Sequence, residues 1–579
     1  MNIYQLFPRL FGNKNQQTKA FGTLEENGCG KLNDINGAAI NALKTLGITH
    51  IWLTGIIRHA KVTDYTKFGI PLSHPQTVKG RAGSPYAISD YYDIDPDLAL
   101  NPTDRLKEFK QAVERIHSQD LGVIIDFVPN HVARQYKSVA KTDQLKDFGE
   151  TDDKSLIFSP QNNFYYLPDK KLTLPEKAGF PFDYEQAYEE IPAKATGNDC
   201  FSANPAITDW YETVKLNYGK DFENHSQTTE PIPNTWTKMF EILDHWAAQG
   251  VDGFRVDMAA MVPIPFWSWV LPKVKARYPK LIFIAEIYES ALYQDFIDAG
   301  FDYLYDKVGL YNRLEDVLRH GHSAESVSIC WKMLNGLDSK MLRFMENHDE
   351  VRLASNQFVG DAFKALPAVS LSALMHCGSF MIYNGQETGE EANGSPGFSG
   401  NDGRSTLFDY DHLPAHQNWM NEGKFDGEKL SEKQKKLRLF YQNILSLRQK
   451  SRAISAGKFY DLMWANPWHS NFDPRFIYAF LRYFEEEILL ILVNFHGSES
   501  RNISLKIPED AQKLAAILPS ENDRCWIAEN LFEGSDKQAF KPQKLHKEGL
   551  ALHIEPSQTL IYKLQPIPAN YDKSNYENC

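Results

Sequence analysis

Long hydrophobic runs are missing from this sequence of 579 residues. No apolar stretch is long enough to span a bilayer. The first residues, MNIYQLFPRLFG, lack the basic and apolar regions of a secretion signal. We therefore expect a cytoplasmic protein with no membrane partner, although removal of a signal peptide would leave the same picture.

Paired cysteines and positive charge are also scarce. The six cysteines are scattered and none forms a Cys-x-x-Cys pair, so neither a zinc knuckle nor a redox motif is indicated. We expect free thiols in a reducing compartment. The formal net charge is −13, and no run of lysine and arginine forms a basic patch. Nucleic acid is therefore not an expected partner, because neutralising phosphates needs a basic surface.

What the sequence does contain is a regular alternation of short apolar segments and amphipathic stretches. The helical stretches include residues 104–119 and 234–250. Alternation of this kind predicts an α/β fold, and eight strands predict a (β/α)8 TIM barrel. A doubly wound sheet is the alternative, but no glycine-rich phosphate turn follows the first strand. The eight predicted strands begin at Ile3, Thr49, Gly122, Gly253, Ile282, Tyr303, Met341 and Phe380.

Two segments depart from this alternation. Residues 132–218 separate the third strand from its helix, and so long an insertion predicts a subdomain over the carboxyl face of the barrel. Residues 457–566 contain alternating strands and predict a C-terminal antiparallel β-sandwich domain. The barrel would then comprise residues 1–131 and 219–456, and residues 567–579 are expected to form a disordered tail.

Acidic residues stand where three of the predicted strands end. Alternation along the fourth strand places Arg255 and Asp257 on one face, where the guanidinium would keep the carboxyl group ionised and nucleophilic. Glu286 ends the fifth strand and Asp349 follows the seventh. A single Arg–Asp pair could simply staple a strand end. Three acids from separate strands converge on the carboxyl face of a barrel, where barrel enzymes hold their active sites.

The motifs around these acids resemble those of a known family. DFVPNH, GFRVDMAAM, FIAEI and MENHDEVR look, in this order, like four signature regions of the α-amylase family, glycoside hydrolase family 13. GSPYAISDYYDIDP and FMIYNGQETGEE extend the resemblance over nearly the whole chain.

The resemblance implies a retaining hydrolase of α-glucosidic bonds, α-1,4 bonds foremost, in α-glucans or malto-oligosaccharides. A transglycosylase, or a member specific for α-1,6 bonds or small α-glucosides, remains the alternative. A non-catalytic carbohydrate-binding relative is disfavoured, because such proteins usually lose one or more of the acids.

The resemblance also assigns roles to individual residues. Asp257 matches the nucleophile that forms a covalent glycosyl-enzyme, Glu286 the acid/base and Asp349 a third carboxylate that binds sugar hydroxyls. The apolar neighbours of Glu286 favour a raised pKa. Asp126 is expected to support the site rather than react. The matched substrate-binding residues are Tyr86, His131, Arg255 and His348.

No cofactor is expected for the chemistry, but the resemblance raises the question of a structural calcium ion. Asn130 matches a calcium ligand of the family, while Ala260 and Met261 replace a common Lys-His pair whose histidine carbonyl binds the same ion. Calcium needs six to eight oxygens, so one matched ligand does not make a site. The alternative is that Asn130 braces the loop after the third strand. Met258 also departs from the common pattern and leaves the linkage preference open.

Overall fold

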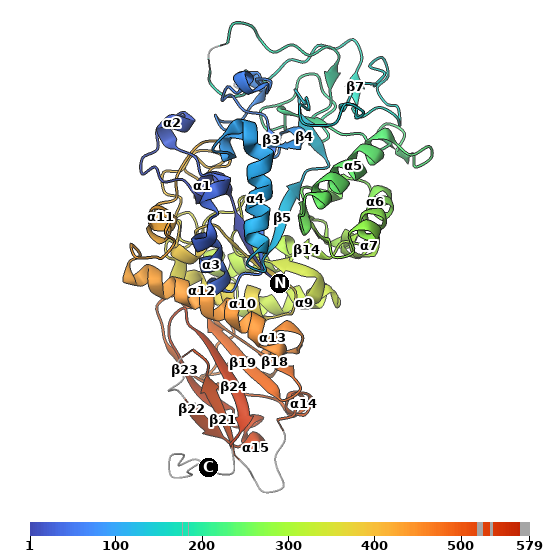
Figure 1. The fold of residues 1–579 in the computed structure, drawn as a ribbon. Helices are drawn as coiled ribbons and strands as arrows, with labels where there is room; N and C mark the ends of the chain where they lie inside the picture. Colours follow the sequence, from blue (N-terminus) through green and yellow to red (C-terminus); the bar gives the residue numbers. More distant parts are fainter. Residues whose placement is uncertain (177, 183, 518–524, 533–536, 568–579) are drawn as a thin grey trace.

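The computed structural model describes residues 1–567 except 177, 183, 518–524 and 533–536 (Figure 1). Eight parallel strands close into a barrel in the order β1-β16-β15-β14-β13-β12-β5-β2. All eight predicted strands are confirmed, and the predicted tail after Ile567 lies outside the described residues. The strands are β1 (Asn2–Leu6), β2 (His50–Leu53), β5 (Gly122–Phe127), β12 (Gly253–Val256), β13 (Ile282–Ala285), β14 (Tyr303–Tyr305), β15 (Met341–Arg343) and β16 (Ser379–Tyr383).

Helices surround the barrel because each carries an apolar face. In α4, the buried side chains from Phe109 to Ile116 recur at helical spacing. The longest helix, α12, begins at a capping box made by Ser431 and Gln434. The longer helices are α3 (Gly37–Leu46), α4 (Arg105–His117), α5 (Asn234–Ala248), α6 (Ile264–Arg277), α7 (Tyr293–Ala299), α8 (Asn312–His320), α10 (Leu366–Leu374), α11 (Pro414–Met420) and α12 (Glu432–Lys450).

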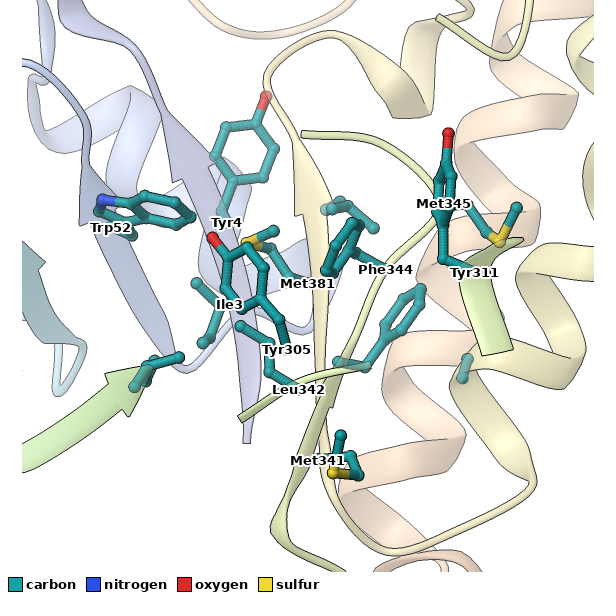
Figure 2. Packing of buried hydrophobic residues seen from close by; sticks show 14 of the residues in the cluster. Ile3, Tyr4, Trp52, Tyr305, Tyr311, Met341, Leu342, Phe344, Met345 and Met381 are labelled. Atoms are coloured by element: carbon teal, nitrogen blue, oxygen red, sulfur yellow. The ribbon is translucent and has the colours of Figure 1, made fainter. Parts of the chain in front are cut away.

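The barrel interior is packed with large side chains. Trp52, Tyr305 and Met381 belong to one buried cluster, part of which is drawn in Figure 2. The rings of Trp52 and Tyr305 also lie 5.3 and 5.5 Å from the guanidinium carbon of Arg255. The aromatic layer therefore forms the floor beneath this arginine and favours its charge through the ring faces.

The segment between β5 and α5 forms small antiparallel sheets that lie at the top of Figure 1. β6 (His131–Ala133) pairs with β9 (Thr213–Lys215), and β7 (Tyr166–Leu167) pairs with β8 (Ala193–Lys194). In the first pair His131 lies opposite Lys215. This pairing ties the far end of the insertion to the segment that directly follows β5.

The C-terminal part of the chain is an antiparallel β-structure, as predicted, at the bottom of Figure 1. One six-stranded sheet has the order β17-β18-β19-β24-β21-β22, and β20 pairs with β23. Five of these strands were predicted; β17, β21 and β22 were not, because they are short and lack a clear apolar alternation. The bounds are β17 (Lys458–Asp461), β18 (Ile477–Phe484), β19 (Glu487–Asn494), β20 (Arg501–Leu505), β21 (Trp526–Asn530), β22 (Lys537–Phe540), β23 (Leu550–Ile554) and β24 (Thr559–Pro566).

A buried arginine joins this sheet to the barrel. Arg482 of β18 donates hydrogen bonds to the carbonyl oxygens of Met375 (2.9 Å) and Ala453 (3.0 Å). Since buried guanidinium groups must be hydrogen-bonded, these contacts fix the sheet against the barrel. Within the barrel, Arg448 of α12 donates to the carbonyl oxygen of Gly378, which precedes β16 (2.6 Å).

The prediction of six free thiols needs one correction. Among the residues that the structure describes, four cysteines are free and Cys525 is disulfide-bonded. Scattered spacing does not fix cysteine connectivity, so the sequence could not reveal this. Within the described ranges, no helix has the length and apolar character needed to cross a membrane. The free cysteines are Cys29, Cys200, Cys330 and Cys377.

Candidate active site

Arg255 is the centre of the candidate site. It is fully buried, and its Nη1 lies 2.8 Å from Asp257 Oδ1 while its Nη2 lies 2.7 Å from Glu286 Oε1. Its Nε donates to the hydroxyl of Tyr305 at 3.1 Å. Adjacent parallel strands place these groups, because β12 pairs with β13 in a register that sets Val256 beside Ala285. One guanidinium thus holds two carboxyl groups at the carboxyl ends of neighbouring strands.

The pKa of Asp257 differs from the sequence-based expectation. Burial raises this pKa above its ordinary value, and the opposing effect of Arg255 is smaller. Arg255 thus acts in the expected direction, toward the ionised carboxylate, but desolvation by burial is the larger effect on this pKa. Burial also raises the pKa of Glu286, against the effect of Arg255, as its apolar neighbours suggested.

Glu286 makes further contacts that orient its carboxyl group. The backbone N–H of Met258 donates to Oε2 at 2.8 Å, and the hydroxyl of Tyr288 donates to Oε1 at 2.7 Å. The loop after β12 and the loop after β13 thus both hold the same carboxyl group. Fixed partners of this kind reduce the freedom of the carboxyl group, as its predicted acid/base role would require.

Asp349 and His348 lie on the loop after β15. His348 Nε2 lies 3.1 Å from Asp349 Oδ2 and 2.6 Å from the hydroxyl of Tyr86, whose ring stacks on the imidazole. Gln5 Nε2 contacts His348 Nδ1 at 2.7 Å. Burial, with a contribution from Arg255, lowers the pKa of His348 well below its ordinary value. A neutral imidazole therefore links Tyr86 to Asp349, whose pKa burial raises well above normal.

The remaining predicted substrate-binding residue, His131, is also buried at this face. Its ring lies 5.3 Å from the ring of Trp210 and hydrogen-bonds to the backbone of Tyr86. Burial lowers the pKa of His131 to about 4, so this imidazole is also neutral. The fold thus brings His131 and Tyr86 together, while the roles assigned to the matched residues stay predictions.

Asp126 occupies a supporting position beneath these groups. Its Oδ1 lies 3.6 Å from Arg255 Nη1, and its Oδ2 accepts the backbone N–H of Gly55 at 3.2 Å. Burial raises the pKa of Asp126 to about 7, even though Arg255 acts in the opposite direction. A buried carboxyl group that holds its proton near neutral pH links the stability of the fold to pH.

Replacing Asp126 by asparagine is expected to flatten the dependence of stability on pH. The carboxyl group is protonated in the folded protein up to about pH 7, but in the unfolded chain only up to about pH 4. Its contribution to stability is therefore full below about pH 4 and is lost as the pH rises through about 7. Between about pH 5 and 8, the melting temperature of the parent should fall more than that of D126N, as measured by differential scanning fluorimetry. Equal falls would contradict the assignment.

Asn130 does not lie in an arrangement suited to calcium. Its Oδ1 accepts a hydrogen bond from the ammonium group of Lys215 at 2.5 Å, and its Nδ2 donates to the carbonyl of Gly197 at 2.8 Å. Among the described residues, no cluster of three or more His, Cys, Asp and Glu side chains could hold a metal ion. The space next to Asn130 Oδ1, where a calcium ion would have to bind, is therefore occupied by the ammonium group of Lys215.

Sequence reasoning missed several residues of the site. Tyr305 ends β14 and Gln5 lies near the end of β1, so an inspection of every strand end would have found both. Tyr288 lies two residues after Glu286 and could have been found by proximity. Arg404, from the loop after β16, donates to the backbone carbonyl of Asp349 at 2.6 Å. Nothing in its local sequence indicates this contact.

The closed barrel, with its three acids at the carboxyl edge, defines the class: a glycoside hydrolase built on a TIM barrel. The family model of the alpha amylase catalytic domain matches residues 5–457. The chain therefore belongs to the α-amylase family of glycosidases.

Comparisons with individual proteins agree with this membership. The chain is 22% identical over 524 residues to neopullulanase 2 of Thermoactinomyces vulgaris, with 88% of this chain and 72% of that protein covered. It is 25% identical over 510 residues to a cyclomaltodextrinase of a Bacillus species, with 85% and 72% covered. A solved α-amylase from Geobacillus thermoleovorans, complexed with acarbose, superposes with a TM-score of 0.61 at 18% identity, over 97% and 98% of the two chains.

Proposed function

We propose that the protein hydrolyses α-glucosidic bonds, α-1,4 bonds foremost, in malto-oligosaccharides or longer α-glucans, with retention of configuration. The observation that carries this proposal is the shared guanidinium of Arg255, which contacts both Asp257 and Glu286. A retaining glycosidase needs two carboxyl groups on opposite sides of one glycosidic bond. The activities named for the neopullulanase and the cyclomaltodextrinase support α-glucan oligosaccharides as the substrate class.

In the first step, an Asp257 oxygen attacks the anomeric carbon and the bond to the leaving oxygen breaks. The electron pair of that bond passes to the leaving oxygen, which takes a proton from Glu286. The raised pKa of Glu286 favours the protonated form that this step requires. Arg255 favours the ionised form of Asp257, which this step requires, and so opposes the rise in pKa that burial causes.

In the second step, Glu286 acts as a base. It removes a proton from water, whose oxygen attacks the anomeric carbon and releases the Asp257 carboxylate. Asp349, with the neutral His348 and Tyr86 beside it, presents oxygen and nitrogen atoms to the hydroxyl groups of the same sugar ring. Hydrogen bonds that strengthen as the ring flattens would lower the barrier to both steps.

The anomeric form of the first product is the direct test. Digestion of maltoheptaose, followed by proton NMR from the first minutes, is expected to show the α-anomer before mutarotation mixes the two forms. Release of the β-anomer from this α-linked substrate would contradict both the covalent intermediate on Asp257 and the retaining mechanism. Boiled enzyme provides the baseline.

The second candidate function is that of a transglycosylase or of an enzyme specific for α-1,6 bonds. Met258 is the residue that supports this alternative. This residue directly follows Asp257 and its backbone N–H donates to Glu286 Oε2 at 2.8 Å, so the backbone that carries this bulky side chain adjoins both carboxyl groups. Incubation with starch, pullulan, isomalto-oligosaccharides, dextran and sucrose separates the candidates. Products longer than the substrate would indicate transfer, and cleavage of isomalto-oligosaccharides alone would indicate α-1,6 specificity.

A further inference from the structure

Lys215 is a buried cation at the junction of the barrel and the insertion. It is the last residue of β9 and only 3% of its side chain is exposed. Burial lowers its pKa, while the nearby Asp199 acts in the opposite direction. A buried ammonium group is costly unless its three N–H groups all find acceptors.

Three oxygens from three separate segments surround this ammonium group. Nζ lies 2.5 Å from Asn130 Oδ1, 2.6 Å from Asp199 Oδ1 and 3.2 Å from the backbone carbonyl of Met261. Asn130 follows β5, Asp199 belongs to the insertion, and Met261 belongs to the loop after Asp257. Three donors thus meet three acceptors, one of which carries the compensating negative charge.

The same three oxygens include the position where the family resemblance placed a calcium ligand, Asn130. They do not fit calcium here, because the ammonium group lies among them and carries positive charge. Calcium also needs six to eight oxygens at 2.3–2.6 Å, and one carboxylate, one amide and one carbonyl fall short of that number. The residues therefore fit a monovalent cation on a side chain rather than a divalent ion.

We propose that the Lys215 ammonium group takes the place of a structural calcium ion and positions two parts of the active site. Asn130 precedes His131, and Met261 lies four residues after Asp257, so one cation sets the distance between the two segments. The amide of Asn130 is fixed on its other side by the carbonyl of Gly197. Independence from calcium follows from this arrangement whether or not the proposed substrate is correct.

Thermal unfolding with and without calcium tests the proposal. After dialysis against EDTA, the parent protein is expected to keep its melting temperature, and added CaCl2 should not change it. K215A should melt lower in EDTA, because Asp199 loses its counter-charge. CaCl2 should then raise the melting temperature of K215A by about 2 °C or more, because the vacated space leaves a carboxylate, an amide oxygen and a carbonyl and gives room for water to supply the remaining ligands. Purification with CaCl2 throughout covers the case in which K215A folds poorly.

Two further variants separate a cation site from a general loss of packing. K215M fills most of the space but offers no charge, so it should be destabilised and remain insensitive to calcium. K215A/D199N lacks the carboxylate and should also fail to respond. Isothermal titration should detect calcium binding to K215A and none to the parent.

The positioning role has its own measurement. K215A should lose kcat on maltoheptaose in EDTA, and CaCl2 should restore part of it, whereas K215M should stay impaired under both conditions. Stabilisation of the parent by calcium, or an equal response of K215A and K215M, would overturn the proposal. If the substrate assignment fails, the melting temperatures still decide the question, because they need no substrate.

Discussion

Replacing Asp257 by asparagine is expected to lower kcat on maltoheptaose by a factor of about 10⁴ or more, with little change in the fold. The amide cannot form the glycosyl-enzyme, yet it matches the size of the carboxyl group and can still accept from Arg255. Because burial raises the pKa of Asp257, loss of its charge should not destabilise the protein. Steady-state rates and melting temperature, measured on one preparation, give both results.

A matched control for D257N is D306N, which alters another aspartate beyond the end of a barrel strand. Asp306 follows β14, accepts from Arg343 at 2.8 Å and caps the segment that begins at Lys307. D306N should therefore lower the melting temperature while the folded fraction keeps its rate. If D257N retained the parental rate, the nucleophile would have to be another group.

Replacing Arg255 by methionine is expected to damage stability and activity together. The substitution leaves the carboxyl groups of Asp257 and Glu286 without the charge that lies 2.8 and 2.7 Å from them. Removing one partner from a buried ion pair typically costs about 3–5 kcal/mol. The rate should fall by about 10²–10³, the scale seen when one electrostatic contact at a reacting centre is lost. Denaturant unfolding and steady-state kinetics measure the two effects.

The loss of stability in R255M should depend on pH in a definite direction. Without the guanidinium, both carboxyl groups become harder to ionise, so the variant should lose more stability at about pH 8 than at about pH 5. R255K is the control, because a single ammonium group keeps the charge but cannot match two carboxyl groups as a guanidinium fork does. A stability loss that is the same at both pH values would contradict the assigned electrostatics.

The barrel could be predicted because each of its strands is short, apolar and buried on both faces. GVIIDF, for example, is buried from Val123 to Phe127, and Asp126 is the one polar residue in that apolar run. Strand ends at one face of a barrel then bring Asp257, Glu286 and Asp349 together without further information. Strands such as β17 and β22 depend on their partners in the sheet rather than on their own pattern, which is why they were missed.

The finer parts of the site depend on contacts that sequence position does not encode. Lys215 and Asn130 lie 85 residues apart and meet only because β6 pairs with β9. The pKa of Asp257 could not be predicted either, because the sequence showed its neighbour Arg255 but not how deeply both are buried. A local motif identifies an ion pair, whereas the balance between charge and desolvation is a property of the folded interior.

One arginine at the base of the barrel bears on how far this molecule can be divided. Arg482 donates to the backbone oxygens of Met375, which follows α10, and of Ala453, in the short helix Arg452–Ser455 after α12. A chain cut before β17 would leave these carbonyl groups and the apolar underside of α10 facing water. The C-terminal sheet is therefore not an exchangeable module, and barrel and sheet should melt as one cooperative unit.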